Sequence, residues 1–229
     1  MRRNLVVVRA GDESMHPEWD DGIPRNFDLL VSYYMGMDFF DDESEYQHVL
    51  AGPPWRGNAA VCKEFSKVVA SYEYVAFADD DIVAPYATLN LLFDVCGAYG
   101  LDLATPSISV NIPIDLPMQE GTLLRYMDRS DLICPVFSQR ALERLVSTFS
   151  ESSSGWGLPQ LWSHLCPHPA YVTAVVDVAN IKHLRPFNGD RVQAGGARPL
   201  QEQQRVFLKY GLKPQVRRFF GSLPLPAAG

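Results

Sequence analysis

The amino-acid sequence predicts an α/β protein in which a mainly parallel central sheet is flanked by helices. Short apolar runs typical of strands alternate with segments of helical periodicity. The runs are apolar almost throughout, which is typical of strands buried on both faces of a parallel sheet. This alternation favours right-handed crossover connections, and a length of 229 residues suits one domain.

Five apolar runs are the predicted strands. β-Branched and aromatic residues, which favour strands, are common in the second and in the last of them. In chain order the runs are residues 5–8, 28–34, 74–78, 102–105 and 171–178.

Four segments are the predicted helices because their apolar residues recur three and four positions apart. Ser138 is a typical capping residue, and Gly100 follows a predicted helix, where glycine is favoured. The acidic residues 36–54 and the Ser- and Gly-rich residues 147–157 are predicted loops. The predicted helices are residues 58–69, 85–99, 138–149 and 200–210.

Composition and charge disfavour some classes of protein function. Hydrophobic residues make up 47% and charged residues 21%, which is typical of a packed globular chain. The 20 Lys and Arg against 27 Asp and Glu give a net charge of −7, which disfavours a nucleic-acid partner because phosphate contacts need a cationic surface. We expect residues 1–220 to form a single domain and residues 221–229, which lack periodicity, to form a flexible tail.

Three features of the sequence bear on the cellular location of the protein. No apolar run reaches the roughly 18 residues needed to span a bilayer. The four cysteines are widely spread and form no CxxC pair, which favours a reduced, cytoplasmic setting. Basic residues and two phenylalanines in residues 205–220 could contact an anionic membrane surface peripherally. A solvated helix face followed by a frayed tail is the favoured interpretation of these residues.

Three consecutive carboxylates are the strongest functional signal. Asp79, Asp80 and Asp81 directly follow the predicted strand at residues 74–78. Adjacent carboxylates repel one another, and a divalent cation such as Mg²⁺ or Mn²⁺ would offset that repulsion. Ligands of open α/β sheets bind at the carboxyl ends of the strands. The sequence therefore predicts a metal site here, and a solvated acidic turn is the alternative.

A second cluster follows the last predicted strand, in the segment VVDVANIKHLRP. His183 is of a residue type that ligates metals, and Arg185 could contact phosphate. Both clusters follow strands of one predicted sheet, so we expect them at the same edge. A surface turn of mixed charge is the alternative.

These two motifs, with FDLLVSYY, ICPVFSQRAL and SGWGLPQLW in their order along the chain, resemble glycosyltransferases of the GT-A fold. Within that fold they are similar to the DUF707-like proteins, and the resemblance covers roughly residues 5–212. It implies a GT-A-like domain in which a DxD motif holds a metal that bridges the two phosphates of a nucleotide-sugar. The implied reaction moves a sugar to a glycan or lipid-linked acceptor, as in polysaccharide biosynthesis.

The resemblance also implies roles for individual residues. Asp79 and Asp81 correspond to the outer residues of the DxD motif and His183 to a late metal-binding histidine, so these three are the implied ligands of Mn²⁺ or Mg²⁺. Lys63 could approach a phosphate or the sugar. An exposed helical lysine is the alternative. The residues implied to bind the nucleotide-sugar are Arg9, Ala10, Lys63, Asp79, Asp80 and Arg185.

The chain departs from the implied pattern after GWGL. The resemblance implies an acidic residue there, whereas this chain has Pro159 and Gln160, and an amide cannot act as a general base. The candidate catalytic residues are therefore Asp177 and Asp131, with Glu151 as a third. Asp131 could instead only cap a turn.

Trp156 and Gly157 are the candidate acceptor-binding residues. The indole could stack on the apolar face of a sugar, and the glycine beside it permits close backbone approach. A buried tryptophan that anchors the loop is the alternative.

Two other functions would use the same residues. A metal-dependent phosphohydrolase or nucleotidyltransferase would need two metals about 3.5–4 Å apart, and the sequence offers few ligands for a second one. A non-catalytic glycan-binding module would explain the missing acid after GWGL. The sequence contains no P-loop, no GxGxxG after the first strand and no GxSxG motif.

Overall fold

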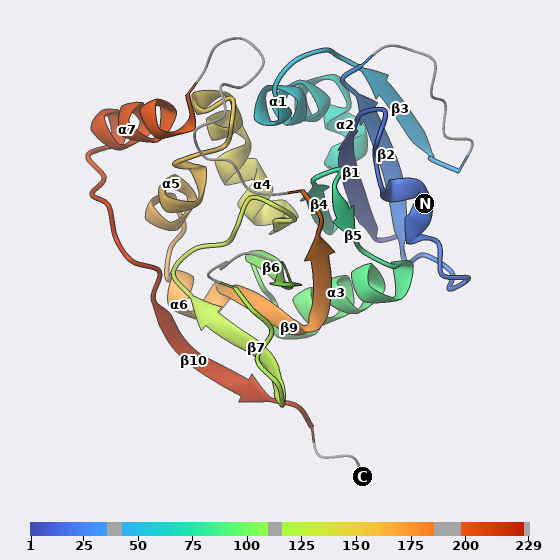
Figure 1. The fold of residues 1–229 in the computed structure, drawn as a ribbon. Coiled ribbons are helices and arrows are strands. Elements are labelled where there is room, and N and C mark those ends of the chain that lie inside the picture. The colour runs from blue at the N-terminus through green and yellow to red at the C-terminus, as the bar shows by residue number, and fades with distance from the viewer. Residues whose placement is uncertain (36–42, 110–115, 186–197, 227–229) are drawn as a thin grey trace.

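The computed structural model of the chain describes residues 1–35, 43–109, 116–185 and 198–226. A sheet runs through its centre in the strand order β10-β7-β9-β6-β8-β4-β1-β2-β3, with β5 paired to β9 (Figure 1). The strands are β1 Asn4–Ala10, β2 Phe27–Tyr33, β3 Tyr46–Val49, β4 Tyr74–Ala78, β5 Ile82–Val83, β6 Leu103–Ser109, β7 Thr122–Met127, β8 Val136–Ser138, β9 Thr173–His183 and β10 Phe219–Pro224.

Helices cover both faces of this sheet, and Figure 1 shows α5 and α7 side by side and away from α3. No helix in the described part of the chain combines the length and the apolar character that crossing a membrane requires. The helices are α1 Pro54–Glu64, α2 Ser66–Val69, α3 Tyr86–Tyr99, α4 Gln139–Leu145, α5 Leu158–Leu165, α6 Pro169–Val172 and α7 Pro199–Tyr210, with 3-10 helices η1 His16–Trp19 and η2 Val146–Glu151.

Two hydrophobic cores lie on opposite faces of the sheet. On β1, Val6 and Val8 join the core that contains α3, whereas Leu5 and Val7 join the core that contains α1, α4 and α5. Successive side chains of a strand point to opposite faces, so one apolar run supplies both cores. The predicted α/β class, with helices flanking a central sheet, is confirmed.

The pairing of the strands is mixed, although the apolar runs predicted mainly parallel pairing. Parallel neighbours are β3, β2, β1 and β4 in one half of the sheet, and β6 and β9 in the other. β8 lies antiparallel between β4 and β6, and β7 is antiparallel to β9 and β10. The antiparallel strands β7 and β10 contain partly or fully exposed residues, so no continuous apolar run marks them in the sequence.

Predicted signals for helix ends are confirmed at two positions. The Ser138 hydroxyl caps α4 by accepting a hydrogen bond from the Ala141 amide at 3.1 Å, and Gly100 ends α3 with a φ of 60°. The helix predicted over residues 138–149 continues as η2 after α4. The helix predicted over residues 58–69 divides into α1 and α2.

Two segments that we predicted to lack regular structure contain strands. The predicted loop at residues 36–54 contains β3, and residues 36–42 lie outside the described part. The expected tail at residues 221–229 belongs to β10 as far as Pro224, and residues 227–229 lie outside the described part. Both strands pair with an existing sheet, which supplies backbone partners without any apolar periodicity in the segment.

Candidate metal centre

Four strands end at one edge of the sheet. β1, β2 and β4 are parallel neighbours, so their carboxyl ends lie together. β9 runs in the same direction, because β8 is antiparallel to both β4 and β6, and β6 is parallel to β9. The three aspartates follow β4 and His183 ends β9, so this edge brings the two predicted motifs together.

Two backbone contacts join the ends of β4 and β9. β5 directly follows the aspartates and pairs antiparallel with the end of β9, which sets Ile82 opposite His183. The Leu184 amide donates a hydrogen bond to the Asp81 carbonyl at 2.9 Å. The backbone therefore holds the imidazole beside the carboxylates.

Asp79, Asp81 and His183 form the candidate metal centre. One ligand atom from each residue lies within 4.8 Å of the other two, and His183 Nε2 is 3.3 Å from Asp81 Oδ1. Carboxylate oxygens suit Mg²⁺ and Mn²⁺, and imidazole adds a nitrogen that transition metals accept. Among the described residues, no other three His, Cys, Asp or Glu side chains come this close together.

The electrostatics of the centre fit a cation. Burial raises the pKa of Asp79 well above its usual value, and the carboxylates of Asp81, Asp80 and Asp131 raise it further. The buried Asp81 Oδ1 and His183 Nδ1 have no hydrogen-bond partner among the described residues. Buried polar atoms without partners are costly, and a bound divalent cation would both satisfy such atoms and offset the repulsion.

Asp80 has a different set of partners. Its Oδ2 accepts hydrogen bonds from the Gly11 amide at 3.0 Å and the Tyr34 hydroxyl at 2.8 Å. Its Oδ1 lies 3.2 Å from Nη1 of Arg185. Because these three partners follow β1, β2 and β9, the middle aspartate joins the ends of three strands. Its carboxylate is occupied by protein groups, so its surroundings do not support the expected role in nucleotide-sugar binding.

Arg185 links the aspartate turn to the loop that follows β1. Its Nη2 donates to the Glu13 carbonyl at 3.2 Å, and the Met15 amide of the same loop donates to the Asp80 carbonyl at 2.7 Å. The Arg185 side chain is still 39% exposed. Part of its guanidinium is therefore available to an anionic ligand at the rim of the centre.

Arg9, which the resemblance implies to bind the nucleotide-sugar, is buried instead. Its guanidinium donates to the Ser32 hydroxyl at 2.8 Å and to the carbonyls of Leu50 and Gly52 at 2.9 and 3.0 Å. Burial lowers the pKa of Arg9 to about 10, so the side chain stays charged at neutral pH while tying β1 to β2 and to the segment after β3. The Ala10 side chain is fully buried as well.

Three further predicted residues lie elsewhere on the molecule. Lys63 is exposed in the last turn of α1, which agrees with the alternative of a solvated lysine. Trp156 is half-buried just before α5. Gly157 has a φ of 92°, and a Cβ there would lie 3.2 Å from Gln203 Cα. Packing of the SGWG loop against α7 therefore explains this glycine without an acceptor sugar.

A buried carboxylate holds the SGWG loop in place. Glu202 of α7 accepts hydrogen bonds from the amides of Ser153 and Ser154 at 3.0 and 2.8 Å and from the Ser152 hydroxyl at 3.2 Å. Burial alone would raise the pKa of Glu202, but these hydrogen bonds outweigh it and lower the pKa below its usual value.

Asp177, the first candidate base, is fully buried in a structural ion pair. Its Oδ1 and Oδ2 contact the Arg125 guanidinium at 2.8 and 2.9 Å, and Oδ1 also accepts a hydrogen bond from the Gln119 amide at 2.8 Å. These partners use both oxygens. The predicted catalytic role is therefore not supported for Asp177.

Asp131, the second candidate base, lies in the segment beside the metal centre. The Asp79 amide donates to the Ile133 carbonyl at 2.9 Å, and the Asp131 carboxylate contributes to the raised pKa of Asp79. Its Oδ1 caps a turn by accepting from the amides of Leu132 and Ile133, and its Oδ2 is 3.4 Å from Arg217 Nη2. The side chain is 21% exposed.

Sequence reasoning missed Gly11, Tyr34 and Glu202. Gly11 and Tyr34 directly follow β1 and β2, so the rule that ligands bind at the carboxyl ends of strands could have found them. Glu202 lies among other polar residues of a predicted helix, and no local signal distinguishes it.

Comparisons with known proteins identify solved structures of similar fold. No protein-family model and no curated protein sequence matches the chain. The structure of GalNAc-T7 with UDP, GalNAc and Mn²⁺ matches with a TM-score of 0.63 at 9% identity, over 90% of this chain and 48% of that one. Residues 1–349 of TarS from S. aureus match with a TM-score of 0.53 at 14% identity, over 80% of this chain and 60% of that one. The same TarS segment in complex with UDP-GlcNAc matches with a TM-score of 0.53 at 13% identity, over 82% and 60%.

These likenesses confirm the GT-A-like fold that the motifs predicted. The chain spans between about half and three fifths of the length of these solved structures. At such low identity the likeness concerns the fold alone. Without a matching family model, the narrower resemblance to the DUF707-like proteins stays a prediction.

Proposed function

We propose that this protein is a metal-dependent glycosyltransferase that moves a sugar from a nucleotide-sugar to a glycan or lipid-linked acceptor. The observation that carries the proposal is the centre of Asp79, Asp81 and His183 at the carboxyl ends of the strands of a GT-A-like sheet. Structures of the same fold contain UDP, UDP-GlcNAc, or UDP with GalNAc and Mn²⁺, which supports a nucleotide-sugar as the ligand class.

In this proposal Asp79, Asp81 and His183 hold Mn²⁺ or Mg²⁺. When bound, the cation supplies Lewis-acid stabilisation of the leaving diphosphate. Arg185 exchanges its contact with Asp80 for a phosphate oxygen, because its side chain is partly exposed at the rim. The backbone after β1, from Gly11 onward, borders the nucleotide, since it lies against the aspartate turn.

Asp131 is the candidate general base for the acceptor hydroxyl. Asp131 belongs to the segment that contacts Asp79, and its side chain is partly exposed. Asp177, by contrast, is fully buried in an ion pair with Arg125. A base in this position would take the proton as the acceptor oxygen attacks the sugar. Trp156, half-buried just before α5, is the candidate platform for the acceptor sugar.

A thermal-shift panel tests the donor and the metal together. UDP-, GDP-, CMP- and dTDP-sugars are added with and without Mn²⁺, and a ligand that binds the native state raises Tm by mass action. We expect one nucleotide series to raise Tm only with Mn²⁺, and Asp81→Asn to abolish that rise. Asp94→Asn is the matched control, because Asp94 is an exposed aspartate of α3, outside both the centre and the loop after β1. A Tm rise that is unchanged in Asp81→Asn would contradict the metal role.

Product analysis separates the proposed transferase from the two other functions. Transfer of labelled sugar to an acceptor supports the proposal. Release of free sugar or nucleotide monophosphate without transfer would instead favour a phosphohydrolase. Calorimetric binding of an oligosaccharide, with no binding of any nucleotide-sugar in the presence of Mn²⁺, would favour a glycan-binding module.

A further inference from the structure

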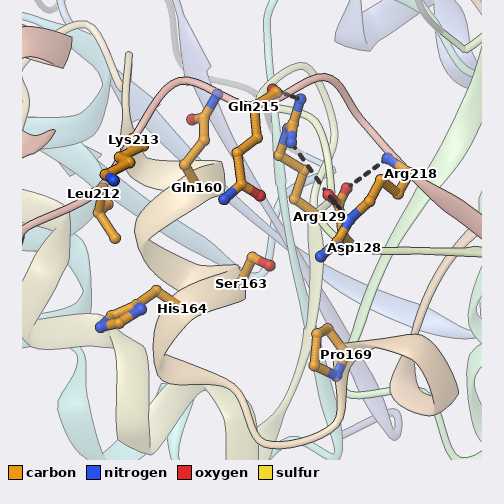
Figure 2. A pocket seen from close by; sticks show the side chains of 10 residues that line it. All are labelled: Asp128, Arg129, Gln160, Ser163, His164, Pro169, Leu212, Lys213, Gln215 and Arg218. Atoms are coloured by element: carbon orange, nitrogen blue, oxygen red, sulfur yellow. Dashed lines mark hydrogen bonds and ion pairs between the residues drawn. The ribbon is translucent and has the colours of Figure 1, made fainter.

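A cleft outside the metal centre lies between α5, α6, the end of β7 and the segment that leads from α7 to β10. Its volume is about 310 Å³. Figure 2 shows Gln160 and Ser163 on one side, on α5, and Asp128, Arg129 and Arg218 on the other. We call it the basic cleft, because its lining contains more cations than carboxylates.

Cations outnumber carboxylates in the lining of the basic cleft. Arg129, Lys213 and Arg218 line the cleft, and Asp128 is the single carboxylate of the lining. Asp128 is buried and lies 3.3 Å from Arg129 Nη1 and 3.5 Å from Arg218 Nε. Because Asp128 is shared by two arginines, it neutralises the charge of Arg218 only in part. The Arg218 side chain is 65% exposed and Lys213 is exposed, so both are accessible to a ligand.

Neutral polar groups also line the basic cleft. Gln160 and Ser163 lie three positions apart on α5 and therefore share a face. The Gln160 Oε1 atom is buried and has no hydrogen-bond partner among the described residues. In Figure 2 the Gln215 side chain lies between these two residues and Arg129. The cleft thus offers amide and hydroxyl groups beside its cations, which suits a ligand with both an anionic group and hydroxyls.

The basic cleft is close to the metal centre along the chain. Arg129 lines the cleft, and the Ile133 carbonyl accepts the Asp79 amide at 2.9 Å. Four residues of extended chain span at most roughly 14 Å, so the backbone at Arg129 lies within that distance of the backbone at Ile133. Arg217, next to Arg218, also contacts Asp131 at 3.4 Å. A ligand in the basic cleft would therefore lie on the same side of the candidate metal centre as Asp131.

We propose that the basic cleft binds a phosphate monoester carried by the acceptor, with its sugar against α5. This inference rests on the proposed function, because it treats the cleft as the acceptor side of that site. The two exposed cations of the lining, Arg218 and Lys213, match a phosphate dianion better than a singly charged carboxylate, and an arginine with a lysine is a common phosphate-binding pair. The cleft volume lies at the lower end of the range for small-ligand pockets, which suits one phosphorylated sugar unit.

Calorimetry with glucose 1-phosphate, without donor and without metal, tests the proposal. We expect the wild-type protein to bind it and glucose to show no heat. The double variant Lys213→Gln with Arg218→Gln should weaken binding roughly tenfold or more, because both charged contacts are lost. Both side chains are exposed, so this variant should fold. Lys67→Gln, an exposed cation on α2, is the matched control and should bind like the wild type.

A second arm identifies the source of the phosphate. Vesicles of phosphatidylcholine with and without phosphatidic acid present the same group on a lipid. Cosedimentation that needs phosphatidic acid, and that is lost in the double variant, supports a lipid-borne phosphate. If neither glucose 1-phosphate nor these vesicles bind, or if every probe that binds the wild type binds the double variant equally well, the proposal is wrong. The UDP and Mn²⁺ measurements are independent of this outcome and continue to test the donor site.

Discussion

Asp81 and Asp177 are buried aspartates of one α/β domain with opposite electrostatic surroundings. Asp177 is fully buried, and the Arg125 guanidinium engages both of its oxygens. Asp81 is 9% exposed and stands with Asp79 beside His183, and its Oδ1 lacks a hydrogen-bond partner among the described residues. The comparison teaches that burial does not identify a functional carboxylate. In the proposed function the missing partner distinguishes Asp81, because a buried polar atom without a partner is costly and a bound cation would satisfy it.

The largest effect that tests this comparison is expected at Asp177. Replacing it by asparagine removes the charge that balances Arg125, whose side chain is only 13% exposed. Loss of one partner of a buried ion pair costs about 3–5 kcal/mol, so Asp177→Asn should lower the free energy of unfolding by that amount. Urea unfolding followed by circular dichroism measures it.

The double variant Asp177→Asn with Arg125→Met is the control for that experiment. Removing both partners leaves no unpaired charge, so the double variant should lose less stability than the sum of the two single variants. A loss below about 1 kcal/mol in Asp177→Asn would show that the pair is not structural, and would return Asp177 to the candidate bases.

Glu202 should show an intermediate effect that depends on pH. Its carboxylate accepts from two amides and a hydroxyl, so Glu202→Gln should cost about 2 kcal/mol at neutral pH. Because the folded pKa lies below the unfolded one, this stabilisation is fully present above the unfolded pKa and is lost as pH falls through the folded pKa. The difference between wild type and variant should therefore shrink in acid, measured by urea unfolding from neutral pH downward. Glu143→Gln, exposed on α4, should show neither effect.

The smallest effect on stability is expected at Asp81. Asp81→Asn removes one of several neighbouring carboxylates, so without metal the free energy of unfolding should stay the same or rise by up to about 1 kcal/mol. Urea unfolding in the presence of a chelator measures this. A loss of several kcal/mol would show that Asp81 is a structural residue like Asp177, and would remove the contrast between the two.

Much of the candidate metal centre could be predicted from the sequence. The position of the three aspartates after an apolar run follows from local patterning, and so does the expectation that two strand ends meet at one edge. The sequence could not predict which of the three aspartates is hydrogen-bonded by other protein groups. Asp80 is occupied by Gly11, Tyr34 and Arg185, and these partners are far from it in the sequence.

The sequence could not predict which aspartate is the better candidate base, for the same reason. Asp131 and Asp177 looked equivalent as acids near apolar runs, and only their partners separate them. Arg125 lies 52 positions before Asp177, in a strand that no apolar run marked. β10 likewise exists because β7 offers it a sheet edge.

The sequence by itself determined the α/β class, the apolar strands that reach both cores, the ends of α3 and α4, and the place of the aspartates after β4. These features depend on neighbouring residues, since hydrophobic periodicity, capping and chain direction act over a few positions. The tertiary structure alone decided which carboxylates are balanced, where Arg9 and Gly157 pack, and that cations gather in a cleft beside α5. Those features depend on pairs distant in the chain, because charge balance and close packing are set by whatever the fold brings into contact.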